Sequence, residues 1–264
     1  MKAAFFIKKS SLKNGGKPSE VIARLREGGV EMYGVNSLSD LCAGTNMIMS
    51  FGGDGTFLTA AGFAYEADIP VLGVNLGRMG FLSAADPDEV AGYILDARYG
   101  IEERPMLCAS GQYALNEVCV YRMGTEAIGV EVAVDGMKLP VYWADGVLVS
   151  TTSGSTAYNL SIGGPICVPG SGVLVISPIA PHNLGVRPLV VPDSAEVRMK
   201  VISRHGGAVF SCDNRSCTVE DGFETVIRKA GRPLKCVTAG NTGFIDALRS
   251  RFFWGMDVRN STEQ

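Results

Sequence analysis

The chain has 264 residues, a formal net charge of −3 and 46% hydrophobic residues, and its lysines and arginines form no basic run, so its charge favours neither a nucleic acid nor an anionic membrane as a partner. No apolar stretch approaches the roughly 18 residues of a membrane span, and lysines directly follow the first apolar run, the reverse of a secretion signal. Seven cysteines without a C-x-x-C pair complete the pattern expected of a cytoplasmic protein with reduced thiols.

The first hundred residues alternate short apolar runs with helix-like stretches. In chain order these segments are 3–7, 19–27, 46–51, 56–66, 71–75 and 88–98. Strands that alternate with helices are typical of a parallel sheet. Residues 1–100 are therefore predicted to form a Rossmann-like α/β domain.

From about residue 101, strand-like runs follow one another at 113–121, 128–134, 137–143, 146–150, 172–176, 196–201, 208–212, 225–228 and 235–238. Turn residues separate them, which predicts a mostly antiparallel, β-rich domain over residues 101–240. Asp135-Gly136 lies between two alternating runs and predicts a type I′ hairpin, in which both central residues have positive φ. A final helix is predicted over 243–253.

A glycine turn follows the run 46–51 and precedes a helical stretch. It consists of Gly52, Gly53, Asp54, Gly55 and Thr56. In such a turn, backbone N–H groups and the positive end of the helix dipole face an anion, which is typical of phosphate binding. A carboxylate beside polyphosphate is repelled unless it accepts a proton from a nucleophile or meets a metal ion, so Asp54 favours phosphoryl transfer. The alternative is a tight turn in which Asp54 only caps the helix.

A second glycine turn, at 73–81, follows the next predicted strand. Because parallel strands end at one edge of a sheet, the two turns are expected to contribute to one site. There Arg78 would meet a phosphate, and Phe81 would either stack on a base or nicotinamide ring or pack in the core.

Two polar residues, Asn116 and Glu117, interrupt the apolar run 113–121. Adjacent residues of a strand point to opposite faces, so at least one of them faces a covered side and needs a partner. A sugar hydroxyl or a purine edge would serve. Alternatively, the glutamate is exposed and the asparagine bonds to the backbone.

The segment 145–165 reads as a strand, a hydroxyl-rich turn and the start of a helix. Its crowded serine and threonine hydroxyls suit phosphate oxygens and ribose hydroxyls, and Tyr158 offers a flat face to an aromatic ring. An N-cap and a turn would account for roughly two of these residues. The segment is therefore predicted to bind a nucleotide.

The motifs GGDGT, Asn116-Glu117, DGxxxSTxSGSTAY and Gly163-Gly164-Pro165-Ile166, in this order, resemble the ATP-NAD kinase family over nearly the whole chain. The GSTAY block is the specific part. GGDGT is shared with diacylglycerol and sphingosine kinases and resembles the phosphate loop of 6-phosphofructokinases. By itself it therefore indicates a phosphotransferase but does not identify the substrate.

This resemblance implies transfer of the γ-phosphate of ATP to the 2′-hydroxyl of the adenosine ribose of NAD, with Asp54 as proton acceptor. It implies that Asn116 and Glu117 contact the dinucleotide and that Asp145 lies near the nicotinamide end. The adenosine pocket would comprise Ser153, Thr156, Ala157, Tyr158 and Ser161, and the loop beside the ATP phosphates Gly52, Gly53, Gly55 and Thr56. The family's homodimers or homotetramers and a last helix, here 241–256, that returns to the first domain are also implied. The sequence shows no cluster of metal ligands, so Mg²⁺ is expected to arrive bound to ATP, its usual carrier in phosphoryl transfer.

Three positions depart from the family's pattern. Thr152 replaces a usual proline, and Trp143 replaces an arginine or small polar residue, which leaves open the preference between NAD and NADH. Asp213-Asn214-Arg215 stands where Asp-Gly-Gln is common, which leaves the role of Arg215 open. The donor, ATP or polyphosphate, the size of the oligomer and feedback regulation also stay open.

Two other functions fit part of the pattern. A lipid kinase of the diacylglycerol type would share GGDGT, although the polar pocket at 153–158 does not suit an apolar substrate. A non-catalytic NADP-binding sensor would keep that pocket but would have no use for Asp54.

Overall fold

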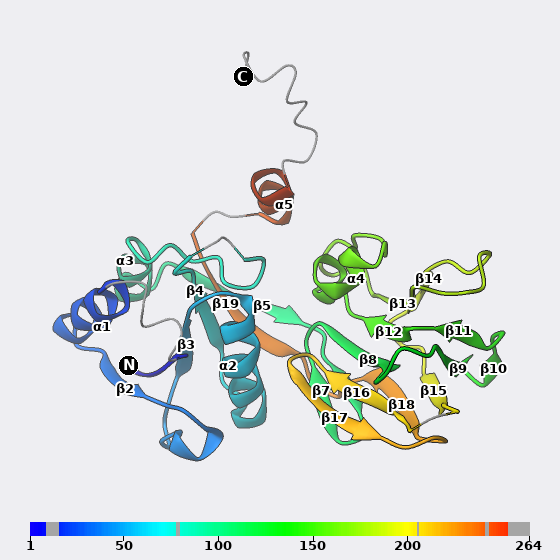
Figure 1. The fold of residues 1–264 in the computed structure, drawn as a ribbon. Helices are drawn as coiled ribbons and strands as arrows, with labels where there is room; N and C mark the ends of the chain where they lie inside the picture. Colours follow the sequence, from blue (N-terminus) through cyan, green and yellow to red (C-terminus); the bar gives the residue numbers. More distant parts are fainter. Residues whose placement is uncertain (9–15, 78–79, 205, 241–242, 253–264) are drawn as a thin grey trace, which may run out of the picture. The chain divides into compact units, whose positions relative to one another are not determined.

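The computed structural model describes residues 1–8, 16–77, 80–204, 206–240 and 243–252 (Figure 1). The chain divides into two compact units, one of Met1–Glu102 with Lys235–Gln264 and one of Glu103–Leu234. The sequence had placed the boundaries at 100 and 240. The structure differs at the second boundary because the strand β19 (Leu234–Ala239) pairs in the sheet of the first unit.

The first unit contains a six-stranded sheet with the order β2-β1-β3-β4-β19-β5. Its pairs β1–β2, β1–β3, β3–β4 and β4–β19 are parallel, which confirms the predicted α/β class. The other strands are β1 (Lys2–Ile7), β2 (Glu31–Gly34), β3 (Met47–Phe51), β4 (Val71–Val74) and β5 (Tyr99–Arg104). The helices are α1 (Lys17–Glu27), α2 (Asp54–Ala67), α3 (Val90–Leu95), α5 (Phe244–Phe252) and the short 3₁₀ helix η2 (Leu38–Asp40).

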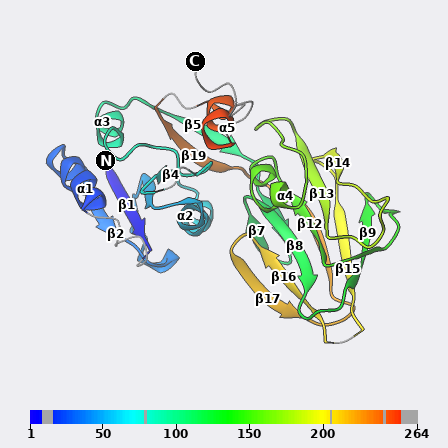
Figure 2. The ribbon, with the colours of Figure 1, turned by 45° about the horizontal axis from the view of Figure 1, so that its top comes forward.

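Helices cover both faces of this sheet. The helices α1 and α3 lie side by side (Figures 1 and 2) and bury Leu25 and Val90 in one cluster with Met49 of β3. On the other face, α2 packs against β3 and β4, and its Phe63 ring meets Phe6 edge to face at 5.7 Å. Burial on both faces explains why these strands are continuous apolar runs. It also leaves the carboxyl ends of β3 and β4, with their glycine turns, at one edge.

The second unit is built from two antiparallel sheets, as predicted. One has the order β10-β9-β15-β18-β6-β7, with β11 also paired to β9, and the other has the order β14-β13-β12-β8-β16-β17. The strands are β6 (Leu107–Ala109), β7 (Gln112–Ala114), β8 (Glu117–Arg122), β9 (Ile128–Val134), β10 (Met137–Lys138), β11 (Tyr142–Ala144), β12 (Gly146–Ser150), β13 (Val173–Ile179), β14 (Leu189–Pro192), β15 (Val197–Ile202), β16 (Ala208–Cys212), β17 (Arg215–Val219) and β18 (Glu224–Lys229). The 3₁₀ helix η3 (Gly154–Thr156) and the one-turn helix α4 (Tyr158–Ser161) follow β12.

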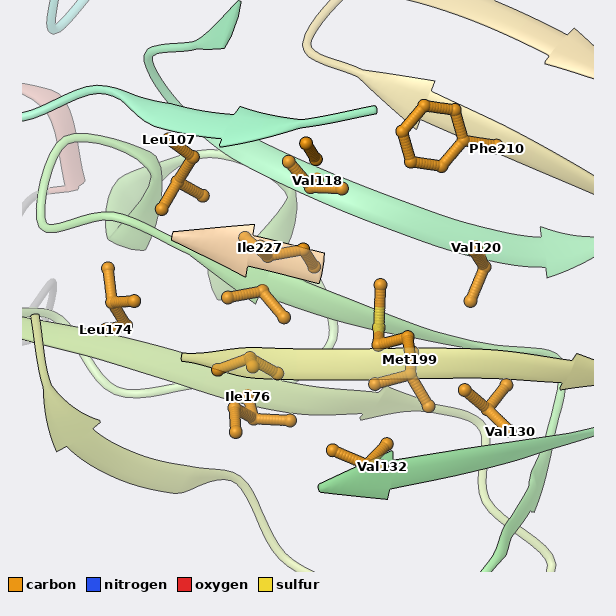
Figure 3. Packing of buried hydrophobic residues seen from close by; sticks show 14 of the residues in the cluster. Leu107, Val118, Val120, Val130, Val132, Leu174, Ile176, Met199, Phe210 and Ile227 are labelled. Atoms are coloured by element: carbon orange, nitrogen blue, oxygen red, sulfur yellow. The ribbon is translucent and has the colours of Figure 1, made fainter. Parts of the chain in front are cut away.

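The core of this unit is a cluster to which both sheets contribute (Figure 3). Val118 and Val120 of β8 and Phe210 of β16 belong to it together with Val130 of β9 and Met199 of β15. Because side chains alternate along a strand, burying Val118 and Val120 turns residues 117, 119 and 121 of β8 to the opposite face. That face carries the candidate site.

The predicted hairpin is confirmed. Asp135 and Gly136 have φ of 49° and 81°, and Met137 pairs with Val134 across the turn. The predicted run 137–143 is instead divided between β10 and β11, since Pro140 lacks the N–H that a ladder needs. None of the helices in the described part of the chain is both long and apolar enough to cross a membrane.

Candidate functional site

The predicted phosphate turn lies between β3 and α2. Gly53 is the N-cap residue of α2 and Asp54 its first residue. Open space stands where Gly53 and Gly55 would carry a Cβ, so a ligand can approach the backbone closely. Thr56 is buried and its N–H donates to the Gly53 carbonyl. Lys8, which the sequence analysis did not select, donates to the carbonyl oxygen of Gly55 at 2.8 Å and adds a cation to this turn.

The Asp54 carboxylate joins the two glycine turns. Its Oδ2 accepts the N–H of Phe81 at 2.8 Å, and its Oδ1 accepts those of Leu82 and Ser83 at 3.0 and 2.9 Å. A Cβ on Gly80 would stand 1.9 Å from Oδ1, so only glycine allows this approach. A carboxylate offers about four lone-pair directions, of which these bonds use three. Asp54 thus retains acceptor capacity on Oδ2, and its partners lie at the end of the second turn and in the two residues after it, which is not the arrangement of a simple helix cap.

The second turn is joined to the first by the backbone as well. The N–H of Gly52 donates to the carbonyl of Val74 at the end of β4. The ring of Phe81 is half-buried and lies 6.3 Å from that of Phe244 in α5, so it already has a packing partner. Arg78 and the residues 241–242 and 253–256 of the predicted last helix lie outside the described residues.

In the second unit, a pocket of about 440 Å³ opens on the face of the sheet that points away from the core. Strands β8 and β16, the turn between β16 and β17, and the helix α4 contribute to it. It is lined by Glu117, Cys119, Tyr121, Tyr158, Ser211, Asp213, Asn214 and Ser216. The structure therefore brings Glu117 and Tyr158, two of the predicted dinucleotide contacts, to one pocket.

In the polar pair Asn116-Glu117, the asparagine is buried and the glutamate is half-buried. Asn116 is 5% exposed, and neither its Oδ1 nor the Oε2 of Glu117 has a hydrogen-bond partner among the described residues. Burial, together with repulsion from the nearby Asp213 carboxylate, raises the pKa of Glu117 to about 8. Unpaired buried polar atoms are costly, so both side chains are suited to receive a polar ligand.

The hydroxyl-rich turn uses more of its side chains for its own structure than the sequence indicated. The hydroxyls of Ser150, Thr151, Ser155 and Thr156 all donate to backbone carbonyls. The expectation that turn formation accounts for only about two of these residues was wrong. The reason is that η3 and α4 are too short to satisfy the backbone of this segment, and hydroxyls replace the missing bonds.

The other predicted contacts of the adenosine pocket differ in accessibility. Tyr158 is 41% exposed and Ser161 is exposed, whereas Ala157 is half-buried and Ser153 is buried. Of these four residues only Tyr158 lines the pocket described above.

Asp145 is held by an ion pair that the sequence analysis missed. The Nε of Arg122 lies 2.6 Å from Oδ1 of Asp145, and a second guanidinium nitrogen lies 3.2 Å from Oδ2. Such two-point pairing fixes the orientation of the carboxylate. An arginine at the end of an apolar strand was the available signal. The nearby Trp143 packs on Gly129, and the Arg204 guanidinium lies over its ring, 5.3 Å from the ring centre.

The two remaining departures differ in their contacts. Thr152 is buried, and its hydroxyl has no partner within the described residues. Arg215 donates to the carbonyl of Tyr113. Across the described ranges, no group of three or more His, Cys, Asp or Glu side chains is placed to hold a metal ion.

Comparison with known proteins gives the same family from sequence and from structure. Residues 35–98 match the model of the ATP-NAD kinase N-terminal domain, and residues 115–239 match that of the C-terminal domain. NAD kinases of Flavobacterium psychrophilum and Bacteroides fragilis are 38% and 40% identical, over 85% and 81% of this chain and 81% and 78% of theirs.

Two solved structures are similar in fold. An NAD kinase from Archaeoglobus fulgidus in complex with ATP superimposes with a TM-score of 0.79 at 28% identity, covering 97% of this chain and 98% of that one. Yeast NADH kinase complexed with NADH gives a TM-score of 0.87 at 23% identity, covering 98% and 90%, and supports the fold alone. The chain therefore belongs to the ATP-NAD kinase family and is a kinase.

Proposed function

We propose that this enzyme transfers the γ-phosphate of ATP to the 2′-hydroxyl of the adenosine ribose of NAD. The hydroxyl oxygen forms a bond to the γ-phosphorus, the bond from that phosphorus to the β–γ bridging oxygen breaks, and NADP and ADP result. The hydroxyl proton passes to the carboxylate of Asp54. The observation that carries this proposal is the position of Asp54, in the first turn of α2 and beside an accessible glycine backbone, with acceptor capacity left on Oδ2.

The fixed geometry of Asp54 supports its role as general base. Its three bonds from the backbone of residues 81–83 hold the carboxylate without a flexible side-chain partner. A base that is already oriented loses little entropy when the substrate hydroxyl arrives. Gly53 and Gly55 would admit the ATP phosphates, and Lys8 would contribute a positive charge.

The dinucleotide would be recognised in the second unit. Asn116 and Glu117 offer buried, unpaired oxygens that suit sugar hydroxyls or a purine edge, and the exposed ring of Tyr158 offers a stacking surface. Glu117 has a raised pKa and is largely protonated near pH 7, so its carboxyl both donates and accepts. The remaining contacts are proposed for Phe81, Asp145, Ser153, Thr156, Ala157 and Ser161.

Mg²⁺ is proposed to arrive with ATP, whose phosphate charge it neutralises during transfer. The accessible backbone of the phosphate turn and the Asp54 carboxylate beside it support this role. A homodimer or homotetramer in the cytoplasm is proposed from the family.

The test is to incubate the purified enzyme with Mg-ATP and NAD and to measure NADP with a coupled glucose-6-phosphate dehydrogenase reaction. NADP should form. A lipid extract and calorimetry with NADP run in parallel separate the alternatives. Phosphorylated lipid would indicate a lipid kinase, and binding without turnover would indicate a sensor. Because Trp143 stands near Asp145 in sequence, NAD and NADH are expected to differ in kcat/KM.

A further inference from the structure

We infer that Asp213 is a positioning residue for the dinucleotide. Its half-buried carboxylate fixes the backbone of Leu115–Glu117 so that the side chains of Asn116 and Glu117 present their unpaired polar atoms to the ligand. This inference rests on the proposed function and assigns a role to the turn between β16 and β17.

The geometry of Asp213 is specific to this segment. Its Oδ2 accepts the N–H of Leu115 at 2.8 Å, and its Oδ1 accepts those of Asn116 and Glu117 at 2.8 and 3.2 Å. Its own N–H donates to the carbonyl of Glu117 at 3.0 Å. Asp213 has φ of 51°, so its backbone is committed to a tight turn at the same point. One residue thus holds three successive N–H groups.

The carbonyl side of the same segment is held by Thr151, the residue that follows β12. The Thr151 N–H donates to the Asn116 carbonyl at 2.9 Å, and the Thr151 hydroxyl donates to the Leu115 carbonyl at 2.5 Å. A Cβ on Gly154 would stand 2.1 Å from the Asn116 carbonyl oxygen, so η3 packs directly on this backbone. The backbone of Asn116 is thus bonded on both sides, while its side-chain Oδ1 is not. This is the arrangement expected when a surrounding shell orients ligand-binding groups.

A second hairpin in the chain shows that the turn alone does not need such a carboxylate. Asp135 occupies the corresponding place between β9 and β10, with φ of 49°. It accepts one N–H, that of Glu196 at 2.8 Å, and it is exposed. Partial burial of a carboxylate costs free energy, and the turn alone does not require it. The three bonds to Leu115–Glu117 account for the partial burial of Asp213.

The Asp213 carboxylate also affects the pKa of Glu117. Several titratable groups face Glu117 from its own strand, from α4 and from the β16–β17 turn, and these are Cys119, Tyr121, Tyr158 and Asp213, with Arg215 beside Asp213. Asp213 is the charged neighbour that raises the pKa of Glu117. Removing that charge must therefore lower the pKa of Glu117.

The test compares Asp213→Asn with Asp135→Asn. Asparagine tolerates the same positive φ and keeps one oxygen, but it loses the charge and turns a donor toward one of the N–H groups. Asp213→Asn should raise both the KM for NAD and the dissociation constant measured by calorimetry at least about tenfold, while kcat and the KM for ATP stay within roughly threefold. The pH at which NAD affinity changes should move down by roughly half a unit or more. Asp135→Asn should change none of these.

Equal effects of the two variants, or a fall in kcat with an unchanged KM for NAD, would overturn the inference. If Asp213→Asn does not fold, Arg215→Ala carries the test, because it removes the bond to Tyr113 just before the same segment and should raise the dissociation constant for NAD about threefold. No change with Arg215→Ala would then overturn it. A wild-type enzyme that binds NAD but forms no NADP refutes the proposed reaction and still allows the comparison of NAD affinities. A wild-type enzyme that does not bind NAD refutes both.

Discussion

Replacing Asp54 by asparagine separates the proposed base from a purely structural acceptor. Asparagine keeps the size of the side chain and one oxygen, which can still accept the N–H groups of Leu82 and Ser83. Its amide nitrogen would then face the N–H of Phe81, donor to donor. A hydrogen bond to a charged group contributes about 1.5–3 kcal/mol, and because Asp54 is partly exposed we expect a loss of about 1–2 kcal/mol in unfolding free energy.

The catalytic effect should be much larger than the structural one. General-base catalysis contributes on the order of 10²–10⁴ in rate, or about 3–5 kcal/mol. Asp54→Asn should therefore lose at least about a hundredfold in kcat, with only a modest change in NAD affinity, while its melting temperature falls by roughly 2–8 °C.

The assay is NADP formation at saturating ATP and NAD, well below the melting temperature of the variant. Asp40→Asn is the matched control, because Asp40 also accepts two backbone N–H groups, at 2.7 and 2.9 Å, in the cap of η2. It should lose stability and keep kcat. If Asp54→Asn stays folded and keeps more than about a tenth of the wild-type kcat, Asp54 is not the base, since one power of ten is only about 1.4 kcal/mol.

Three further changes follow from close contacts and burial. Gly80→Ala places a Cβ 1.9 Å from Oδ1 of Asp54 and should lower kcat at least about tenfold in the NADP assay; an unchanged kcat would contradict the required geometry. Gly154→Ala places a Cβ 2.1 Å from the Asn116 carbonyl oxygen and should cost about 1–3 kcal/mol in denaturant unfolding, whereas a wild-type midpoint would show that η3 can shift freely. Glu117 has a folded-state pKa of about 8, above its unfolded value, so its protonated form stabilises the fold below about pH 4.5 and that contribution is lost as the pH rises through 8. Glu117→Gln should abolish this dependence, which approaches about 1.4 kcal/mol per pH unit, and equal slopes in both proteins would refute it.

Part of the fold could be predicted from the sequence because some local conformations are allowed for few residue types. The Asp135-Gly136 turn was predictable because positive φ at two successive residues has few sequence solutions. The strands β5 and β17 were not, because their YGIEER and RSCTV segments lack regular apolar alternation and depend on neighbouring strands for their pairing. The strand β19 looked like one more strand of the second domain, since sequence order does not say which sheet a strand joins.

The candidate site could likewise be predicted only in part from the sequence. The glycine turn with Asp54 and the buried polar pair Asn116-Glu117 were visible as residue patterns. Their partners were not, because the N–H groups bound to Asp54 are 27 to 29 residues away and those bound to Asp213 are 96 to 98 residues away. The backbone N–H groups of a loop cannot be identified from a pattern of side chains, because only the folded chain brings them close to these carboxylates.

The position of β19 has a consequence for how the chain is made. This strand lies between β4 and β5 in the sheet of the first unit, although residues 105–233 separate it from β5 in sequence. During synthesis, the second unit is complete before the first can close its sheet. Until β19 emerges, β4 presents the unpaired backbone of an apolar edge, which is a template for association with other chains. Folding of the nascent protein is thus expected to depend on protection of that edge until the final strand arrives.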